Sequence, residues 1–110
     1  MAYYMLQWRF AAENIKSLVG NPDSRVDAVR LGVESFGGRL HQYFFAFGDY
    51  DGMALCEFPD QETCTAFLMM VASKGGVGAF KTTPLIPPEE AKRAFQRAGQ
   101  TDTGYRPALG

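Results

Sequence analysis

The chain has 110 residues and a mass of 12.2 kDa, a length that suits one domain and leaves no room for two. Hydrophobic residues make up 46% of it and charged residues 21%, which excludes a disordered chain and provides enough apolar material for a packed core. With 11 basic against 12 acidic side chains there is no positive excess to bind phosphate backbones, so nucleic acid is not expected as a partner.

No segment of the sequence predicts export or membrane insertion. Residues 1–9 lack a basic stretch followed by an apolar one, and no apolar run approaches the ~20 residues that span a bilayer. Cys56 and Cys64 form neither a Cys-x-x-Cys motif nor a zinc-ligand pattern. We therefore expect a cytoplasmic protein with no membrane partner, in which both cysteines are buried small hydrophobic residues; a redox pair is the alternative.

The first half of the chain predicts a strand, two helices and a second strand. Residues 3–8 predict a strand with Tyr3 and Met5 on one face and Tyr4, Leu6 and Trp8 on the other, so both faces are apolar. Residues 11–18 predict a short helix, and 23–36 predict a longer one that ends at two glycines. Residues 39–47 predict the second strand. Its alternation places Leu40, Phe44 and Ala46 on one face and His41, Tyr43, Phe45 and Phe47 on the other.

The second half predicts a hairpin, a helix, a strand and a last helix. Residues 48–52 favour a tight turn into a strand at 53–58, so the two strands that flank this turn form an antiparallel hairpin. Residues 60–74 predict a helix whose first residue is a good N-cap and which two glycines end. A strand is predicted at 77–85, and a helix at 87–98. The expected inner face of this last helix consists of Ala91, Ala94, Phe95 and Ala98.

This order of elements predicts a ferredoxin-like βαββαβ α+β sandwich, with a four-stranded antiparallel sheet and a C-terminal helix. We expect the domain to cover residues 1–98 and a flexible tail to cover 99–110. The helices can cover only one face of the sheet, so the other face is expected to meet the same face of a second copy in a dimeric α+β barrel. We expect that face to carry some of the residues Tyr3, Met5, Tyr43, Phe45, Phe47 and Leu85.

The predicted hairpin turn carries a recognisable motif. It contains Gly48, Asp49, Tyr50 and Asp51, a Gly-x-Tyr-Asp pattern between two strands. With the flanking stretches 22–25, 37–38, 57–60 and 81–85, the chain resembles the GYD-domain family over roughly residues 3–95. The resemblance implies the dimeric α+β barrel fold and no particular reaction. The glycine-rich residues 76–78 and the tail depart from the family pattern.

The motif has a chemical and a structural interpretation. Asp49, Tyr50 and Asp51 place two carboxylates and a phenol in one turn, where a desolvated carboxylate could act as a general base. In the structural interpretation, Gly48 and Gly52 permit the turn through their backbone geometry, an aspartate accepts bonds from backbone amides, and the tyrosine packs at the edge of the core. The structural interpretation is the favoured one.

His41 is the only histidine and the third candidate for a catalytic role, beside Tyr50 and Asp51. On the face expected to meet a second copy, its imidazole could carry a proton or bind haem. One histidine without cysteine or carboxylate residues at ligand spacing is a poor metal site, so we expect no metal and no cofactor. The candidate ligand pocket consists of Trp8, Tyr43, Phe45 and Phe47.

Two functions fit these features. The first is a homo-oligomeric domain, a dimer or larger, whose aromatic sheet face is mainly a subunit interface. The second is a cofactor-independent oxygenase or isomerase, in which a hydrophobic pocket holds a small apolar ligand and His41, Tyr50 or Asp51 transfers a proton. A haem-binding barrel is a weaker third possibility. A sealed core favours the first function, and an enclosed pocket of several hundred Å³ favours the second.

Overall fold

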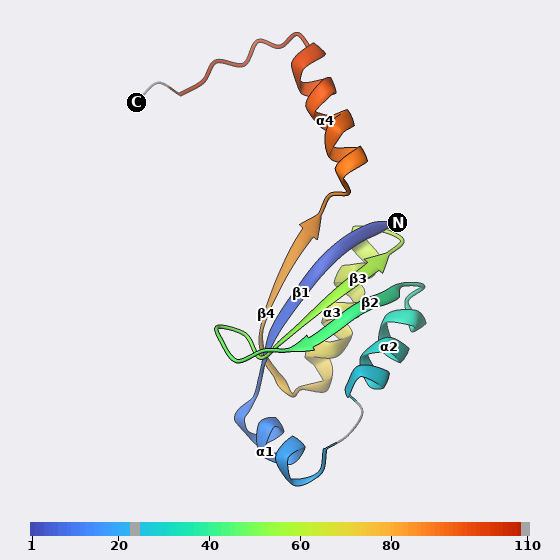
Figure 1. Ribbon diagram of the computed structural model, residues 1–110, viewed down its shortest axis with the longest axis vertical. Helices are drawn as coiled ribbons and strands as arrows, with labels where there is room; N and C mark the ends of the chain where they lie inside the picture. The colour runs from blue at the N-terminus through green and yellow to red at the C-terminus, as the bar shows by residue number, and fades with distance from the viewer. Residues whose placement is uncertain (23–24, 109–110) are drawn as a thin grey trace.

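The computed structural model describes residues 1–22 and 25–108. Its elements are β1 (Ala2–Phe10), α1 (Ala12–Gly20), α2 (Arg25–Ser35), β2 (Arg39–Phe45), β3 (Gly52–Phe58), α3 (Gln61–Lys74), β4 (Val77–Leu85) and α4 (Pro88–Gln100) (Figure 1). The sheet has the order β2-β3-β1-β4, and neighbouring strands are antiparallel. This is the predicted ferredoxin-like α+β fold. The helix start predicted at residue 23 and the last two residues of the predicted tail lie outside the described residues.

The core lies between the sheet and two helices, α2 and α3, which cover the same face (Figure 1). Alternate residues of the two inner strands point into it, as the period of two in their burial shows. The buried hydrophobic residues are Tyr4, Leu6 and Trp8 on β1, Ala54, Cys56 and Phe58 on β3, and Val33, Cys64 and Phe67 on the helices. One face of the sheet is therefore packed, and the other is left open.

Three helix ends follow the predicted signals. Asp60 is the N-cap of α3, and its Oδ1 accepts a bond of 2.8 Å from the backbone N–H of Thr63. Gly75, the C-cap of the same helix, has φ of 77°, and Gly37 after α2 has φ of 74°. Because only glycine adopts these angles without strain, the two glycines end the helices as the sequence predicts.

The Asp60 cap predicts a specific dependence of stability on pH. The bonds from Thr63 lower the pKa of the Asp60 carboxyl below its usual value. A lowered pKa in the folded state means that the carboxylate stabilises the fold above its unfolded pKa of about 3.9, and that this contribution is lost as pH falls through the folded pKa.

We expect Asp60→Asn, which keeps the capping oxygen but does not titrate, to lose less stability than the natural chain between about pH 5 and about pH 3. Urea unfolding of both proteins at the two pH values measures this difference. Parallel loss of stability in both would show that Asp60 contributes nothing to the acid response.

An irregularity in β2 reverses a prediction about the sheet faces. The cross-strand partners are Leu40 with Cys56, Gln42 with Leu55, Tyr43 with Ala54, and Phe45 with Gly52. His41 is thus an extra residue in the register, a β-bulge that shifts the alternation by one. Tyr43 and Phe45 consequently lie on the helix-covered face with Leu40. The prediction that they lie on the open face is wrong.

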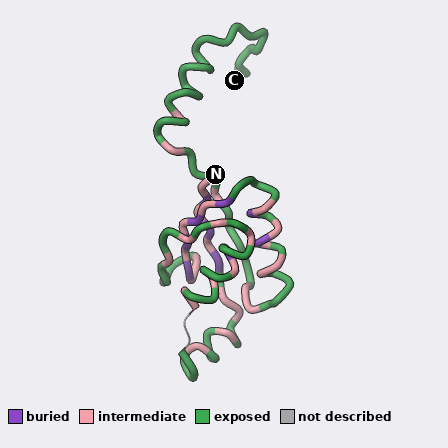
Figure 2. The backbone as a smooth tube through the Cα atoms, turned by 90° about the vertical axis from the view of Figure 1, so that its right-hand side faces the viewer, coloured by how far each residue is buried: buried purple, intermediate pink, exposed green. Residues whose placement is uncertain are grey.

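The last helix, α4, stands clear of the domain that holds the buried residues (Figure 2). None of its residues, all of which are described, is buried, and Phe95 is 77% exposed. The radius of gyration is 17.9 Å, whereas a compact chain of this length has about 13 Å. The prediction that Ala91, Ala94, Phe95 and Ala98 face the chain's own core is therefore wrong.

The short connection between β4 and α4 explains why α4 does not pack on its own domain. Strand β4 ends at Leu85 and α4 begins at Pro88, so two residues connect them. Pro87 has φ of −57°, and the rings of two consecutive prolines restrict the backbone. The chain therefore leaves the end of the sheet without turning back onto it. The predicted boundary between a domain at 1–98 and a tail at 99–110 stays a prediction; α4 continues to Gln100, and residues 101–108 have no regular structure.

Candidate functional site

The uncovered face of the sheet carries a set of apolar side chains from all four strands. Residues that are partners across neighbouring strands share a face, and the register defines this set. It consists of Tyr3 and Met5 on β1, Phe44 on β2, Met53 and Leu55 on β3, and Leu85 on β4. We call these six residues the open-face patch. Phe44 is 55% exposed and Leu85 is 36% exposed, so the patch faces water in the isolated chain.

His41 also lies on the open face, because of the bulge in β2. Its Nε2 is 2.8 Å from Oε1 of Glu57, and its ring centroid is 5.7 Å from that of Tyr3. The histidine is therefore on the face expected to meet a second copy. It lies on the opposite face from Tyr43 and Phe45, whereas the alternation along residues 39–47 predicts that all three share one face. Sequence reasoning missed Glu57 as its partner, since the bulge that brings the two together leaves no signal in the alternation.

Asp51 holds the loop between β2 and β3 against β1. Its Oδ2 accepts a bond of 2.9 Å from the backbone N–H of Phe10, and its own N–H donates to the carbonyl of Trp8 at 2.8 Å. Its carbonyl accepts from the N–H of Ala46 at 2.9 Å. These bonds support the structural interpretation of the motif. Asp49 is exposed and Tyr50 is half-buried.

Removing the Asp51 carboxylate should therefore destabilise the fold. We expect Asp51→Ala to lower the free energy of unfolding by about 1–2 kcal/mol, because the N–H of Phe10 loses its acceptor in a partly buried position. Asp51→Asn, which keeps a side-chain oxygen, should recover most of this loss. Asp49→Ala is the control, with a change within about 0.5 kcal/mol. Urea unfolding measures all three, and equal effects of the two alanine variants would contradict the anchoring role.

Within one chain, His41 lies apart from the other two predicted catalytic residues, Tyr50 and Asp51, which are neighbours in one loop. His41 lies beside Tyr3 near the start of β1, whereas Asp51 binds Phe10 at the end of the same strand. Phe10 is seven positions after Tyr3 in this extended strand, which places the two roughly 20 Å apart. The imidazole and this carboxylate therefore cannot act on the same small substrate in one chain.

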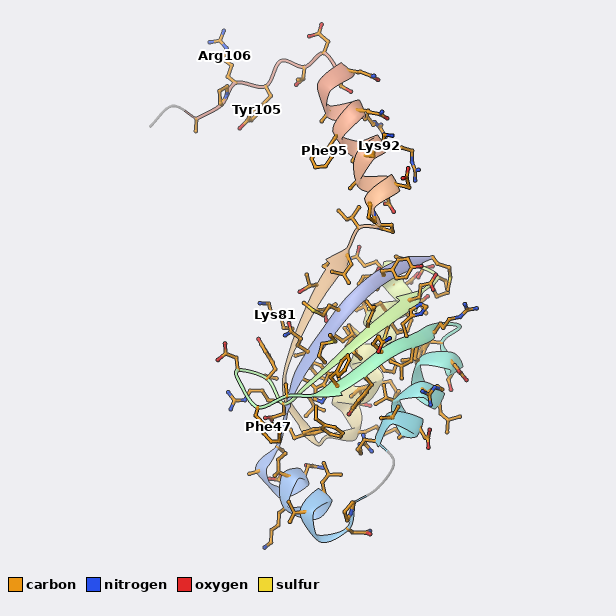
Figure 3. The ribbon with its side chains drawn as sticks, in the orientation of Figure 1. Phe47, Lys81, Lys92, Phe95, Tyr105 and Arg106 are labelled. Atoms are coloured by element: carbon orange, nitrogen blue, oxygen red, sulfur yellow. The ribbon has the colours of Figure 1, made fainter. Side chains whose placement is uncertain are left out.

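Three of the four predicted pocket residues form an aromatic cluster on the face that α2 and α3 cover, and one of them, Phe45, is 53% exposed. The ring centroids of Trp8 and Tyr43 are 5.4 Å apart, and those of Tyr43 and Phe45 are 5.3 Å apart. Phe47 lies in the loop beyond the end of β2 and is fully exposed (Figure 3). The apolar cavity beside this cluster, lined in part by Trp8 and Tyr43, has a volume of only about 50 Å³. That is far below the several hundred Å³ of a substrate pocket.

A larger groove of about 730 Å³ opens between α1, α2 and α3. Its lining combines polar side chains such as Asn14, Arg25 and Lys74 with apolar ones such as Val29 and Met70. In the described part of the chain, neither this groove nor the small cavity is lined by any of the three predicted catalytic residues. Neither of these two cavities therefore provides a substrate site at His41, Tyr50 or Asp51.

The two thiols are buried and free, which confirms their prediction as small core residues. Burial raises the pKa of Cys56 to about 12 and that of Cys64 to about 11. The reactive form of cysteine is the thiolate, which is scarce at neutral pH when the pKa is this high. Neither thiol is suited to act as a nucleophile.

Within residues 1–22 and 25–108, no three His, Cys, Asp or Glu side chains gather where they could hold a metal ion. Over the same residues, no helix is both long and apolar enough to cross a membrane.

Comparisons with known proteins agree with this fold. A family model described as GYD domain matches residues 4–95. The crystal structure of MtbAldR has a TM-score of 0.61 at 14% identity, over 78% of this chain and 53% of that one. The crystal structure of TTHA0845 from Thermus thermophilus has a TM-score of 0.53 at 18% identity, and the match covers 79% of this chain and 95% of that one. The crystal structure of an AsnC family transcriptional regulator from Agrobacterium tumefaciens has a TM-score of 0.55 at 14% identity, and the match covers 96% of this chain and 56% of that one.

At 14% to 18% identity, the similarity to these solved structures shows the fold alone. The match spans only about half the length of MtbAldR and of the Agrobacterium regulator. No curated protein matches the chain in sequence.

Proposed function

This chain belongs to the GYD-domain family, and we propose that it works as a homodimer in which the open-face patch of each copy covers that of the other. The observation that carries the proposal is the exposed apolar face of the sheet, opposite the face that α2 and α3 cover. A sheet that is apolar on both faces needs a layer on each side. A two-fold axis allows the same patch on two copies to form one interface.

Leu55 lies at the centre of the patch. It is on the inner strand β3, between its partners Gln42 on β2 and Met5 on β1. Met53 extends the apolar surface along the same strand, next to Phe44. Methionine side chains adapt to an opposing surface, and two stacked sheets lie about 10 Å apart with their side chains filling the space between them. The centre of the face is therefore suited to apolar packing against a second sheet.

Polar groups lie around this apolar centre. Gln7 and Lys81 are partners on the same face, on β1 and β4. The hydrogen-bonded pair of His41 and Glu57 lies near Tyr3 at the other end of β1. An apolar centre with a polar rim is typical of protein interfaces. Because the imidazole and the carboxylate already bond to each other, contact with a second copy would leave neither polar group without a partner.

The cavities favour this function over an enzyme. A small-molecule oxygenase or isomerase would need a pocket of several hundred Å³ reached by a catalytic side chain. The cavity beside Trp8 and Tyr43 has only about 50 Å³, and the groove of about 730 Å³ between α1, α2 and α3 is lined by none of His41, Tyr50 and Asp51. For the haem-binding alternative, Nε2 of His41 would have to leave its bond to Glu57 before it could approach an iron atom.

A cytoplasmic location is part of the same proposal. Two free thiols fit a reducing compartment, where cysteines stay unpaired. Fractionation of the cells that make the protein tests the location separately from the assembly.

The molecular mass in solution tests the assembly. One chain has a mass of 12.2 kDa. Sedimentation equilibrium of the full chain at micromolar concentrations should give twice this mass. A mass that corresponds to one chain over the same concentrations would overturn the proposal.

A further inference from the structure

The helix α4 has an apolar stripe that its own chain does not cover. Ala91, Ala94, Phe95 and Ala98 are spaced by three and four residues, which places them on one side of the helix. The opposite side carries Glu89, Arg93, Gln96 and Gln100. A lone helix of 13 residues is marginally stable in water, and most helices in proteins depend on packing of their apolar side. The stripe therefore indicates a partner.

The chain's own domain does not supply this partner. The Phe95 side chain projects from α4 into open space, with none of the domain beside it (Figure 3). Only two residues, Ile86 and Pro87, join β4 to α4, and proline rings restrict the backbone at Pro87 and Pro88. To bring the stripe onto its own sheet, the chain would have to reverse its direction at these prolines.

Apolar residues connect the stripe to the open-face patch. Leu85 belongs to the patch and is the last residue of β4, and Ile86, the next residue, is 63% exposed. Beyond the prolines the stripe begins at Ala91 and reaches Phe95. The surface proposed as the subunit interface thus continues along the chain into α4, so a second copy that covers the patch comes next to the helix.

We propose that α4 is an arm that packs its stripe against the second copy of this chain in the homodimer. The inference rests on the proposed function, because the continuity of stripe and patch is what identifies the second copy as the occupant. Two-fold symmetry would make the arm contact twice in each dimer. Each Phe95 would then be buried against the other copy, as aromatic anchors of interfaces commonly are.

The charges of α4 support a protein partner rather than a nucleic acid or an anionic membrane. The helix carries Glu89 and Glu90 in its first turn and Lys92, Arg93 and Arg97 further along. Both signs are therefore present on a short helix, whereas phosphate backbones and anionic lipids select surfaces of one positive sign. The apolar stripe is left as the main binding feature.

The experiment compares two variants of the full chain that each add one negative charge to α4. Phe95→Glu places a carboxylate in the stripe, and Gln96→Glu places one on the opposite side. Because Phe95 is 77% exposed in the single chain, neither change should alter the fold, which circular dichroism checks. We expect Phe95→Glu to raise the dissociation constant of the dimer by about tenfold or more, and Gln96→Glu by less than about twofold, in sedimentation velocity. Equal effects, or none from Phe95→Glu, would overturn the inference.

A cross-linking experiment tests the contact directly. A photo-reactive phenylalanine analogue at position 95 is placed in a mixture of isotope-labelled and unlabelled chains, and mass spectrometry identifies the linked peptides. Links between labelled and unlabelled chains support the arm contact. Links only within one chain would overturn it.

Two variants, Leu55→Asp and Phe95→Glu, distinguish the sheet interface from the arm contact. If Leu55→Asp dissociates the dimer but Phe95→Glu does not, the sheet interface stands and the arm contact is wrong. If Phe95→Glu dissociates the dimer but Leu55→Asp does not, the arm contact stands and the sheet interface is wrong.

Discussion

The Leu55→Asp variant should be monomeric at micromolar concentrations, at which we expect the natural chain to be a dimer. Leu55 is at the centre of the open-face patch, with Met5 as its partner on the neighbouring strand. In the dimer its replacement would bury an unpaired carboxylate on each copy, which costs several kcal/mol. We expect the dissociation constant to rise about 100-fold or more, equivalent to about 2.7 kcal/mol.

The matched control is Leu31→Asp, the same substitution on α2. Leu31 is 68% exposed, and α2 covers the other face of the sheet. Sedimentation equilibrium should therefore give a dimer for this variant. Circular dichroism should give a folded chain for both, because Leu55 is only half-buried in the single chain. A Leu55→Asp protein that stays dimeric would place the interface on another surface.

Gly52→Ala should destabilise the domain by about 3 kcal/mol, the upper end of the usual cost of overpacking. A Cβ atom at Gly52 would lie within 3.0 Å of Cζ2, Cε2 and Nε1 of Trp8, closer than a real Cβ atom approaches its neighbours. The Trp8 ring is 7% exposed and packs against Tyr43, so it has little room to move aside. Thermal and urea unfolding of the variant measure the loss.

Gly48, the first residue of the Gly-x-Tyr-Asp motif, provides the control in the same loop. No atom lies within 4 Å of a Cβ built on it, and its φ is not positive. We expect Gly48→Ala to change the free energy of unfolding by less than about 0.5 kcal/mol. Comparable losses in the two variants would mean that the loop, and not the contact with Trp8, is the cause.

These two glycines also show where sequence reasoning reached its limit. The prediction that Gly48 and Gly52 permit the turn through special backbone angles is wrong, because neither has a positive φ. Gly52 instead leaves space for the indole ring of a different strand, β1. A contact between strands that are far apart in the sequence has no local pattern that could reveal it.

The fold itself could be predicted from local patterns in the sequence. Alternation on β1 identified Tyr4, Leu6 and Trp8 as one face, and all three are buried. The cap at Asp60 and the glycine at position 75 set the limits of α3. Such signals act within a few residues of the chain, which is why they can be read from the sequence.

The neighbours of His41 and the surface against which α4 packs could not be predicted from the sequence. One extra residue in β2 moves Tyr43 and Phe45 to the covered face and leaves the histidine beside Glu57. A bulge changes register without changing composition, so alternation alone gives the wrong face. For α4 the stripe was read correctly from its spacing, but spacing does not say which surface a helix packs against.

The most direct test of the central claim is an isotope-filtered NOE measurement on a dimer of labelled and unlabelled chains. If the open-face patch is the interface, methyl groups of Leu55, Met53 and Met5 in one copy should give intermolecular NOEs to patch residues of the other copy. Such NOEs report protons within about 5 Å, the range of side chains that interdigitate between packed sheets. Intermolecular NOEs that arise only from other surfaces, with none from these methyl groups, would contradict the account.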